Sequence, residues 1–160
     1  MEIKMTAREA YKRFWTQAFV LNQRARRKEF WVPFIIHMTI AAAGLLLAVL
    51  ISPRYPHALL FNLQLISDTV LVIPFFSVLF RRLQDLNITG WTALPVFIFT
   101  ALFNATEFMT LDDTADGAVV FCYAIVSILF FIVLAFDGTE GPNKYGHDPK
   151  EVIDELNPRQ

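Results

Sequence analysis

The stretch FWVPFIIHMTIAAAGLLLAVLI, residues 30–51, decides the fold class because it carries no charged side chain over 22 consecutive positions. About 20 helical residues cross a hydrocarbon core roughly 30 Å thick. Three further apolar stretches follow, at about residues 59–80, 91–109 and 117–136. In lipid the backbone must satisfy its own hydrogen bonds, and these continuous runs lack the alternating polarity of barrel strands. The sequence therefore predicts an all-α fold, an integral membrane four-helix bundle, with residues 1–160 as a single membrane domain.

The composition of the whole chain agrees with a membrane protein and excludes two other classes. Hydrophobic residue types make up 55% and charged types 18%, against about 25% charged in an ordinary soluble domain. Sixteen Phe and three Trp exclude a disordered chain, which has few aromatic residues. Cys122 is the sole cysteine, which excludes a disulfide-stapled module. The net charge of −1 gives no sign of a nucleic-acid partner, and we expect none.

The positive charges fall almost entirely on one side of the predicted spans. Eight Lys and Arg residues precede the first span, two lie between the second and third spans, and three follow the fourth. The loop after the first span carries only Arg54, and the loop after the third carries none. Because loops rich in Lys and Arg stay in the cytoplasm, both termini are predicted to be cytoplasmic. Residues 137–160 are then a cytoplasmic loop and tail.

Residues 6–21 have the pattern of an amphipathic helix. Apolar side chains recur at helical spacing on one face, and cations occupy the other. Thr6 and Glu9 fit a capping box, which places the helix start there. We favour an interfacial helix that lies flat on the membrane, because anionic lipids of the inner leaflet attract its Lys and Arg face. The alternative is a helix packed on a partner or on the chain's own cytoplasmic face.

Three motifs lie next to the predicted spans, on the cytoplasmic side. They are RARRKEFW at 24–31, RRLQDLNITGW at 81–91, which is predicted to be a loop, and GPNKYGHDP at 141–149. In order and spacing they resemble the bacterial inner-membrane family known as domain-of-unknown-function family 805. The resemblance implies an architecture and a compartment, the bacterial inner membrane, but no activity. The chain has Gln23 and Gln84 where the family pattern has glycine and histidine, and glutamine cannot transfer a proton.

The motifs predict a layer of arginines at the cytoplasmic surface. Guanidinium forks suit bidentate capture of phosphate or carboxylate, so the layer is a candidate site for lipid headgroups or another anionic ligand. The alternative is that the arginines enforce topology and hold the loops together through Arg–Asp and Arg–carbonyl contacts. Asp85, four residues after Arg81, is expected to pair with it. The candidate residues are Arg24, Arg26, Arg27, Arg81, Arg82, Asp85, Asn143 and Tyr145.

A second group of polar residues is predicted inside the membrane. Asp68 lies in the second apolar stretch, where a carboxylate costs roughly 2.5–3.5 kcal/mol on insertion scales. At 1.5 Å per helical residue, Asn104 and Tyr123 reach a similar depth on the third and fourth spans. We therefore predict a cluster of Asp68, Asn104 and Tyr123. It either locks the helices together, the interpretation we favour, or forms a proton or ion site.

The sequence carries no signature of an enzyme. His37, His57 and His147 fall in different segments, so no metal site is expected, and no phosphate-binding glycine loop or nucleophile elbow indicates a cofactor or catalytic residue. The predicted role is a non-catalytic accessory or interaction protein that contacts membrane lipids, a protein partner or a second copy. The alternative is a small oligomeric transporter or channel that uses Asp68, and a lipid-modifying enzyme ranks third.

Overall fold

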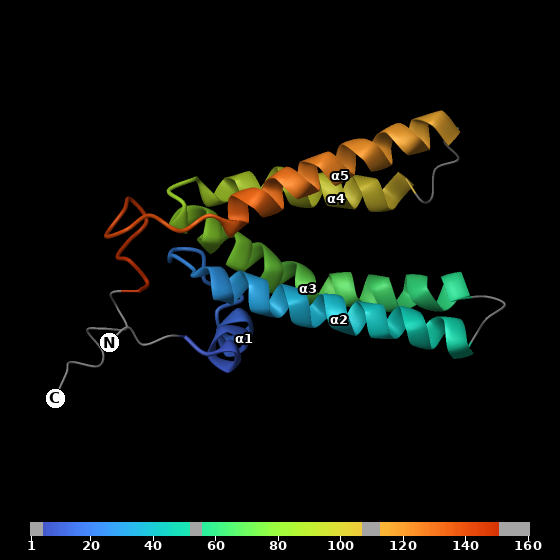
Figure 1. Cartoon of the computed structure of the whole chain (residues 1–160), viewed down its shortest axis with the longest axis horizontal. Coiled ribbons are helices and arrows are strands. Elements are labelled where there is room, and N and C mark those ends of the chain that lie inside the picture. The colour runs from blue at the N-terminus through green and yellow to red at the C-terminus, as the bar shows by residue number, and fades with distance from the viewer. Residues whose placement is uncertain (1–4, 52–55, 107–112, 151–160) are drawn as a thin grey trace. The chain divides into compact units, whose positions relative to one another are not determined.

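The described part of the chain, residues 5–51, 56–106 and 113–150 of a computed structural model, is built from helices and loops (Figure 1). No strand occurs within these ranges, which confirms the all-helical prediction. The helices are α1 (Ala7–Thr16), α2 (Arg27–Ile51), α3 (Pro56–Asp85), the short 3-10 helix η1 (Gly90–Thr92), α4 (Ala93–Thr106) and α5 (Asp113–Ala135).

Four of the helices coincide with the predicted apolar spans, with one informative difference. α3 continues through Arg81 and Arg82 to Asp85, so this part of the second motif is helical and not the loop that was predicted. The helix can continue because Arg, Leu and Gln are good helix formers and no glycine or proline follows until Gly90. It ends where Asn87 takes a left-handed conformation, at a φ of 61°.

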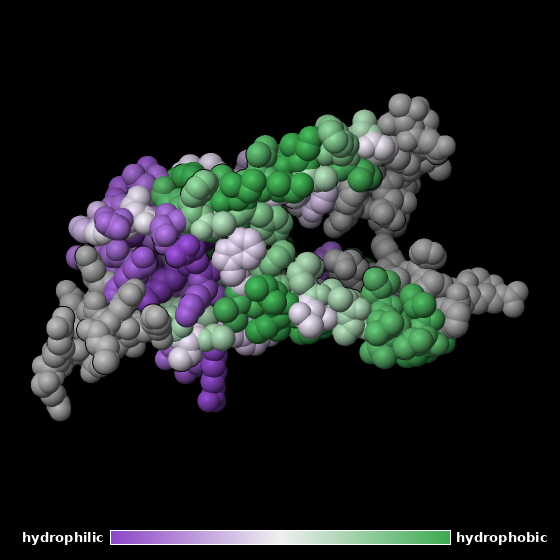
Figure 2. Space-filling model, viewed as in Figure 1, coloured by the Kyte–Doolittle hydropathy of each residue, from purple (hydrophilic) through white to green (hydrophobic). Residues whose placement is uncertain are grey.

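Two helices of the described residues are long and apolar enough to cross a membrane, namely α2 and residues Gly117–Ala135 of α5. Only 6% of the most apolar window of each is buried by the chain itself, so neither resembles the core helix of a soluble protein. Figure 2 shows hydrophobic residues along α5 and hydrophilic residues gathered over the loop that follows it. The number of membrane crossings and the four-helix bundle stay predictions.

The contacts divide the chain into two compact units. The first comprises residues 1–20 and 28–78, and the second comprises residues 21–27 and 79–160. The chain passes from one unit to the other three times: after residue 20, at the start of α2, and within α3.

In the first unit, α1 packs against α2 and α3. The capping box is present: Glu9 donates its backbone N–H to the Thr6 hydroxyl at 3.2 Å, and Thr6 donates its N–H to the Glu9 carboxylate at 2.8 Å. Phe14 is fully buried, with its ring 4.8 Å from the Phe75 ring and 5.7 Å from the His37 ring. The inner face of α1 is thus covered by the chain's own helices, which is the alternative to membrane burial, while Trp15 stays 39% exposed.

The first helix is shorter than the predicted 6–21, because the chain turns directly after Thr16. Ala18 and Val20 donate their N–H groups to carbonyls three residues earlier, at 3.3 and 3.1 Å. The Ser77 hydroxyl on α3 lies 2.9 Å from the Gln17 carbonyl oxygen and 2.7 Å from that of Val20, to which it donates. These contacts replace the hydrogen bonds of a further helical turn.

In the second unit, α4 packs against α5, and the turn after α3 is tightly fitted. The Phe99 ring of α4 stacks on the Tyr123 ring of α5 at 5.9 Å. Gly90 lies against the Phe80 ring, where a Cβ atom would collide with the ring carbons. Trp91 meets the same ring edge-to-face at 5.3 Å. The second motif therefore needs its glycine for close packing.

Candidate functional site

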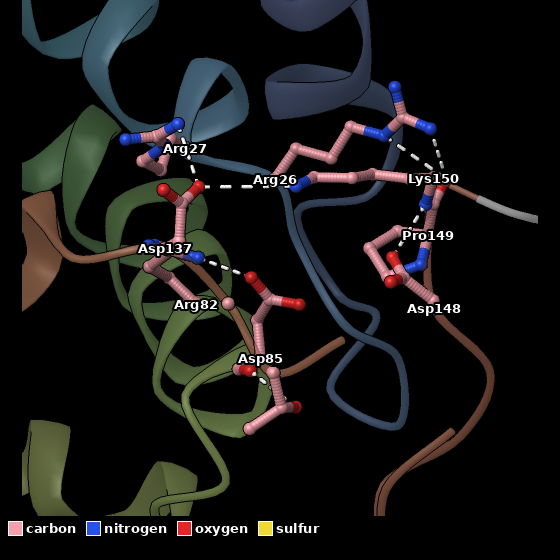
Figure 3. Close-up of a pocket in the computed structure, with 10 residues that line it drawn as sticks. Arg26, Arg27, Arg82, Asp85, Asp137, Asp148, Pro149 and Lys150 are labelled. Atoms are coloured by element: carbon pink, nitrogen blue, oxygen red, sulfur yellow. Dashed lines mark hydrogen bonds and ion pairs between the residues drawn. The ribbon is translucent and has the colours of Figure 1, made fainter. Parts of the chain in front are cut away.

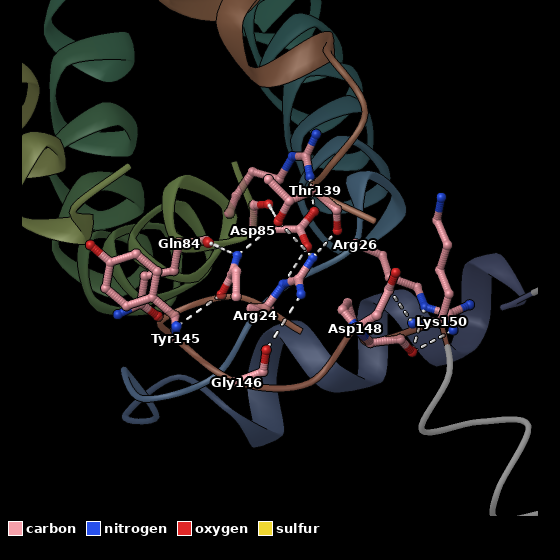
Figure 4. Close-up of polar contacts among 12 residues, drawn as sticks. Arg24, Arg26, Gln84, Asp85, Thr139, Tyr145, Gly146, Asp148 and Lys150 are labelled. Carbon is pink, nitrogen blue, oxygen red and sulfur yellow. Dashed lines mark hydrogen bonds and ion pairs between the residues drawn. The ribbon is translucent and has the colours of Figure 1, made fainter. Parts of the chain in front are cut away.

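Polar side chains from all three motifs converge in the second unit (Figure 4). They come from the segment before α2 and the first residue of α2, from the last turn of α3, and from the loop after α5. We call this group the arginine layer and define it by Arg24, Arg26, Arg27, Arg82, Asp85, Thr139, Asn143 and Asp148. The predicted convergence of the motifs is therefore found in this unit.

Asp85 lies at the centre of the arginine layer. Its Oδ1 atom accepts a hydrogen bond from Arg24 Nε at 3.0 Å, and its Oδ2 atom accepts one from Arg82 Nη1. The predicted Arg81–Asp85 pair is wrong, because Arg24 and the i−3 residue Arg82 take both carboxylate oxygens. The carboxylate is 6% exposed, so this is a buried group of two cations and one anion.

Arg24 joins three separate segments through one guanidinium group. Besides Asp85, it donates from Nη1 to the Gly141 carbonyl at 2.6 Å and to the Gly146 carbonyl at 3.4 Å. Its Nη2 atom donates to the Thr139 carbonyl and, at 3.1 Å, to the Thr139 hydroxyl. All three nitrogens therefore donate within the chain, and the side chain is 1% exposed. This is a structural contact, as the Arg–carbonyl alternative predicted.

Arg82 caps the end of α5. Its Nε and Nη2 atoms each lie 3.3 Å from the Leu134 carbonyl oxygen, and Nη2 also donates to the Phe136 carbonyl. The last four carbonyls of a helix have no partner inside the helix and carry partial negative charge. A buried guanidinium satisfies both the hydrogen bonds and the charge, and Arg82 is fully buried.

The end of α3 is capped in the same way by the segment before α2 and by the loop after α5. Ala25 donates its N–H to the Arg81 carbonyl at 3.2 Å, and Thr139 donates its N–H to the Asp85 carbonyl at 2.9 Å. The Asn143 amide donates to the Gln84 carbonyl at 3.0 Å. The three motifs thus share one physical task, which is to supply donors to the carbonyl ends of α3 and α5.

Burial shifts the acid–base equilibria of the central pair. Desolvation raises the pKa of the Asp85 carboxyl above its ordinary value, and the positive charges of Arg82 and Arg24 oppose that shift. Desolvation lowers the pKa of the Arg82 guanidinium, and the Asp85 charge acts in the opposite direction. The ion pair therefore offsets part of the cost of burying each of the two charges.

The loop after α5 is held in a defined shape by short-range hydrogen bonds. Asn143 and Gly146 exchange two backbone hydrogen bonds, at 3.0 and 3.1 Å, and Asn143 Oδ1 accepts from the Tyr145 N–H at 2.8 Å. Gly141 and Gly146 have positive φ angles of 70° and 129°, which favour glycine. Asp148 accepts from the N–H groups of Gly141 and Lys150, at 3.2 and 2.9 Å.

The outer side of the arginine layer holds a small pocket that opens to solvent, with about 270 Å³ of empty space that includes open solvent (Figure 3). On its rim, Arg27 Nη2 lies 2.7 Å from Asp137 Oδ1, and Lys150 Nζ lies 3.9 Å from the same oxygen. Arg26 Nε donates to the Pro149 carbonyl at 3.0 Å. The pocket is lined by Arg26, Arg27, Arg82, Asp85, Asp137, Gly138, Thr139, Asp148, Pro149 and Lys150.

Several residues of the layer were not among the predicted site residues. Thr139 accepts or donates five hydrogen bonds there, and Asp148 accepts bonds that fix the loop, yet each looks like an ordinary loop residue in the sequence. Gly138 packs against the Asp85 carboxylate, where a Cβ atom would collide with it. The sequence signal that could have found these residues is the run Asp137-Gly138-Thr139, which directly follows the last residue of the fourth predicted span. Of the predicted residues, Arg81 is fully buried at the end of α3.

The residues of the predicted membrane cluster are described one at a time, each within its own unit. Asp68 is exposed on α3 in the first unit, and the Tyr123 ring stacks on Phe99 in the second. The side chain of Asn104, on α4, lies outside the described residues. The cluster therefore stays a prediction. Within the described ranges, no group of three or more His, Cys, Asp or Glu residues could hold a metal ion.

Comparison with known proteins agrees with the motifs. A family model described as a protein of unknown function, DUF805, matches residues 18–147 and thus contains all the residues of the layer except Asp148. The chain belongs to the DUF805 family. Its DUF805 region contains the ends of α3 and α5 together with the residues Ala25, Thr139 and Asn143 that cap α3.

Two relatives are similar to this DUF805 chain over most of their length. Each is named inner membrane protein YhaI, one from Escherichia coli strain K12 and one from Escherichia coli O157:H7. Each is 27% identical over 127 residues, which cover 79% of this chain and 83% of the relative. No solved structure matches the chain. The relatives' name and the uncovered apolar helices together support a membrane protein of unknown function.

Proposed function

We propose that the chain is a multi-pass inner-membrane protein with both termini in the cytoplasm, and that it acts as a non-catalytic interaction protein at the cytoplasmic surface. The arginine layer would be the frame of that surface, and its exposed cations would contact anionic lipid headgroups. The name of the relatives, the uncovered apolar faces of α2 and α5, and the one-sided distribution of Lys and Arg support the location.

The observation that carries this proposal is the division of the cations into two kinds. Arg24 and Arg82 are buried and donate to Asp85 and to backbone carbonyls. Arg27 and Lys150 are 49% and 47% exposed at the rim of the pocket. A ligand from the membrane surface can therefore reach Arg27 and Lys150 but not the buried Arg24 and Arg82. Juxtamembrane cations attract anionic lipids at short range.

The pocket itself favours contact with a headgroup over catalysis. The space inside the pocket itself, as distinct from open solvent, is only about 20 Å³, which is room for about one water molecule, so a ligand can lie against the rim but is not enclosed. The two buried carboxylates of its lining, Asp85 and Asp148, already accept hydrogen bonds from arginines and from backbone N–H groups. Neither is open to a substrate, as a general base must be. Asp137 is exposed and is ion-paired with Arg27 and Lys150.

Native mass spectrometry of the full chain in mixed micelles tests this function. The wild type is expected to retain phosphatidylglycerol in preference to phosphatidylcholine, and the double variant Arg27→Ala with Lys150→Ala is expected to lose that preference. Lys144→Ala is the matched control, because Lys144 is an exposed cation of the same unit that lies over the Tyr145 ring and outside the pocket lining. Equal retention of both lipids by the wild type would overturn the proposal.

Reporter fusions test the location independently. Fusions after Lys28 and after Lys150 are expected to report the same, cytoplasmic side of the membrane. Fusions on opposite sides would separate the first motif from the third across the membrane, and the proposed surface could not exist.

A further inference from the structure

Asp137 lies on the open rim of the pocket, two residues after α5 ends at Ala135. Its carboxylate is 62% exposed, and the single oxygen Oδ1 lies 2.7 Å from Arg27 Nη2 and 3.9 Å from Lys150 Nζ (Figure 3). Both cations are themselves about half exposed. One carboxylate oxygen is therefore shared by two cations that solvent reaches.

This arrangement contrasts with Asp85 in the same layer. Asp85 is buried, and each of its two oxygens has its own arginine donor, so it cannot leave without exposing buried charge. Asp137 is held by exposed ion pairs, which contribute little because water and dissolved ions compete for both partners. A stronger anion can therefore displace Asp137 from Arg27 and Lys150 while the frame stays intact.

The chemistry of the two cations favours phosphate as that stronger anion. An arginine fork binds phosphate oxygens in pairs, and lysine binds phosphate as a point charge. The pocket lining holds four cations and three acids, so its charge is positive before any ligand arrives. The carbonyl end of α5 would repel an anion, but Arg82 donates to the carbonyls of Leu134 and Phe136 and offsets this repulsion.

We propose that Asp137 is an internal placeholder, whose carboxylate occupies the position of a ligand phosphate between Arg27 and Lys150 and leaves when a phosphate-bearing headgroup binds. The inference rests on the proposed headgroup contact and deepens it. The placeholder lowers the affinity of the rim for every anion, and it keeps Arg27 and Lys150 close together when no ligand is present. Removal of the Asp137 carboxylate should therefore strengthen binding of the headgroup. Removal of a salt bridge that only supports the fold would not have this effect.

The test is retention of phosphatidylglycerol by the full chain in phosphatidylcholine micelles, measured by native mass spectrometry. Asp137→Asn is nearly isosteric and is expected to raise retention about two- to fivefold, the range that an exposed ion pair represents. The added change Arg27→Ala is expected to cancel the gain. Glu140→Gln is the matched control, because it changes the net charge equally at an exposed position of the same loop outside the pocket lining.

A gain in Asp137→Asn that equals the gain in Glu140→Gln would overturn the placeholder, because it would report net charge only. A loss of phosphatidylglycerol in Arg27→Ala without any gain in Asp137→Asn would also overturn it, while the headgroup function would stand. A second arm adds millimolar inorganic phosphate. If inorganic phosphate displaces the lipid, free phosphate is also a ligand of this site. If lipid retention is undiminished, the ligand is the lipid headgroup. Either result supports the placeholder only when Asp137→Asn also raises retention.

Discussion

Arg24 and Asp85, 61 residues apart in the sequence, form a buried ion pair in which Arg24 Nε lies 3.0 Å from Asp85 Oδ1. The same guanidinium also donates to the carbonyls of Thr139, Gly141 and Gly146. One side chain thus connects the segment before α2, the end of α3 and the loop after α5. The planar, five-donor geometry of arginine is what allows a single residue to reach all of these acceptors.

Arg24→Ala is expected to destabilise the protein by about 3–5 kcal/mol, because Asp85 and Arg82 would lose a buried partner. Arg24→Lys is expected to be only partly tolerated, since an ammonium group cannot reproduce the guanidinium fork. Thermal unfolding in detergent measures both. Arg27→Lys is the control: its ion pair with Asp137 is half exposed, so the change should stay below about 1 kcal/mol. Equal losses for Arg24→Lys and Arg27→Lys would contradict the structural role of Arg24.

Gly138→Ala tests the contact between the loop and Asp85. A Cβ atom at Gly138 would collide with the Asp85 carboxylate, which two arginines hold in place, so the loop must move away from α3. Overpacking of this kind costs about 1–3 kcal/mol. Gly44→Ala in α2 is the control, because nothing lies within 4 Å of its added Cβ. Alanine also favours a helix over glycine. A midpoint for Gly138→Ala at or above the wild type would show that the loop is not packed on Asp85.

The convergence of the arginine layer could be predicted from the sequence, but its pairings could not. Charge placement puts the three motifs on one side of the predicted spans, and the structure brings Arg24, Arg82 and Asn143 together in one unit. The i, i+4 rule assigned Asp85 to Arg81. The actual partner choice depends on which arginine faces Arg24 and the end of α5, and helix spacing does not contain that tertiary information.

The C-terminal ends of α1 and α3 also depend on tertiary contacts that the local sequence does not contain. Apolar periodicity predicted the amphipathic helix, and Thr6 with Glu9 predicted its capping box. The helix nevertheless ends at Thr16, because Ser77, 57 residues after Val20, donates to the carbonyls of Gln17 and Val20 in place of a further helical turn. The second motif was expected to be a loop because it follows the predicted apolar span, which ends at residue 80. Its residues 81–85 are helical, and residues of two distant segments supply donors to the carbonyls of Arg81, Gln84 and Asp85.

The capping box of α1 gives a prediction about pH. Hydrogen bonds from the Thr6 backbone and hydroxyl lower the pKa of Glu9 below its ordinary value of 4.5. A depressed pKa means that the stabilisation is present above pH 4.5 and is lost as the pH falls through the folded-state pKa. Hydrogen exchange of the α1 amides should therefore accelerate, relative to the rest of the chain, below about pH 4.5. Glu9→Gln should remove this acid-specific step, and an unchanged step in that variant would assign it to another group.

Asp68 gives the prediction that separates an interaction protein from a transporter. A carboxylate within an apolar helix is a candidate proton or ion site, and Asp68 lies on the described part of α3 among exposed apolar residues such as Leu65 and Val70. The non-catalytic function proposed above expects no proton or cation flux in vesicles that contain the full chain, and the same baseline for Asp68→Asn. The measurement is dye-reported flux across a pH gradient, with Asp137→Asn as the charge-matched control. Flux in the wild type that disappears in Asp68→Asn and persists in Asp137→Asn would identify a transport path through α3 and would replace the interaction role.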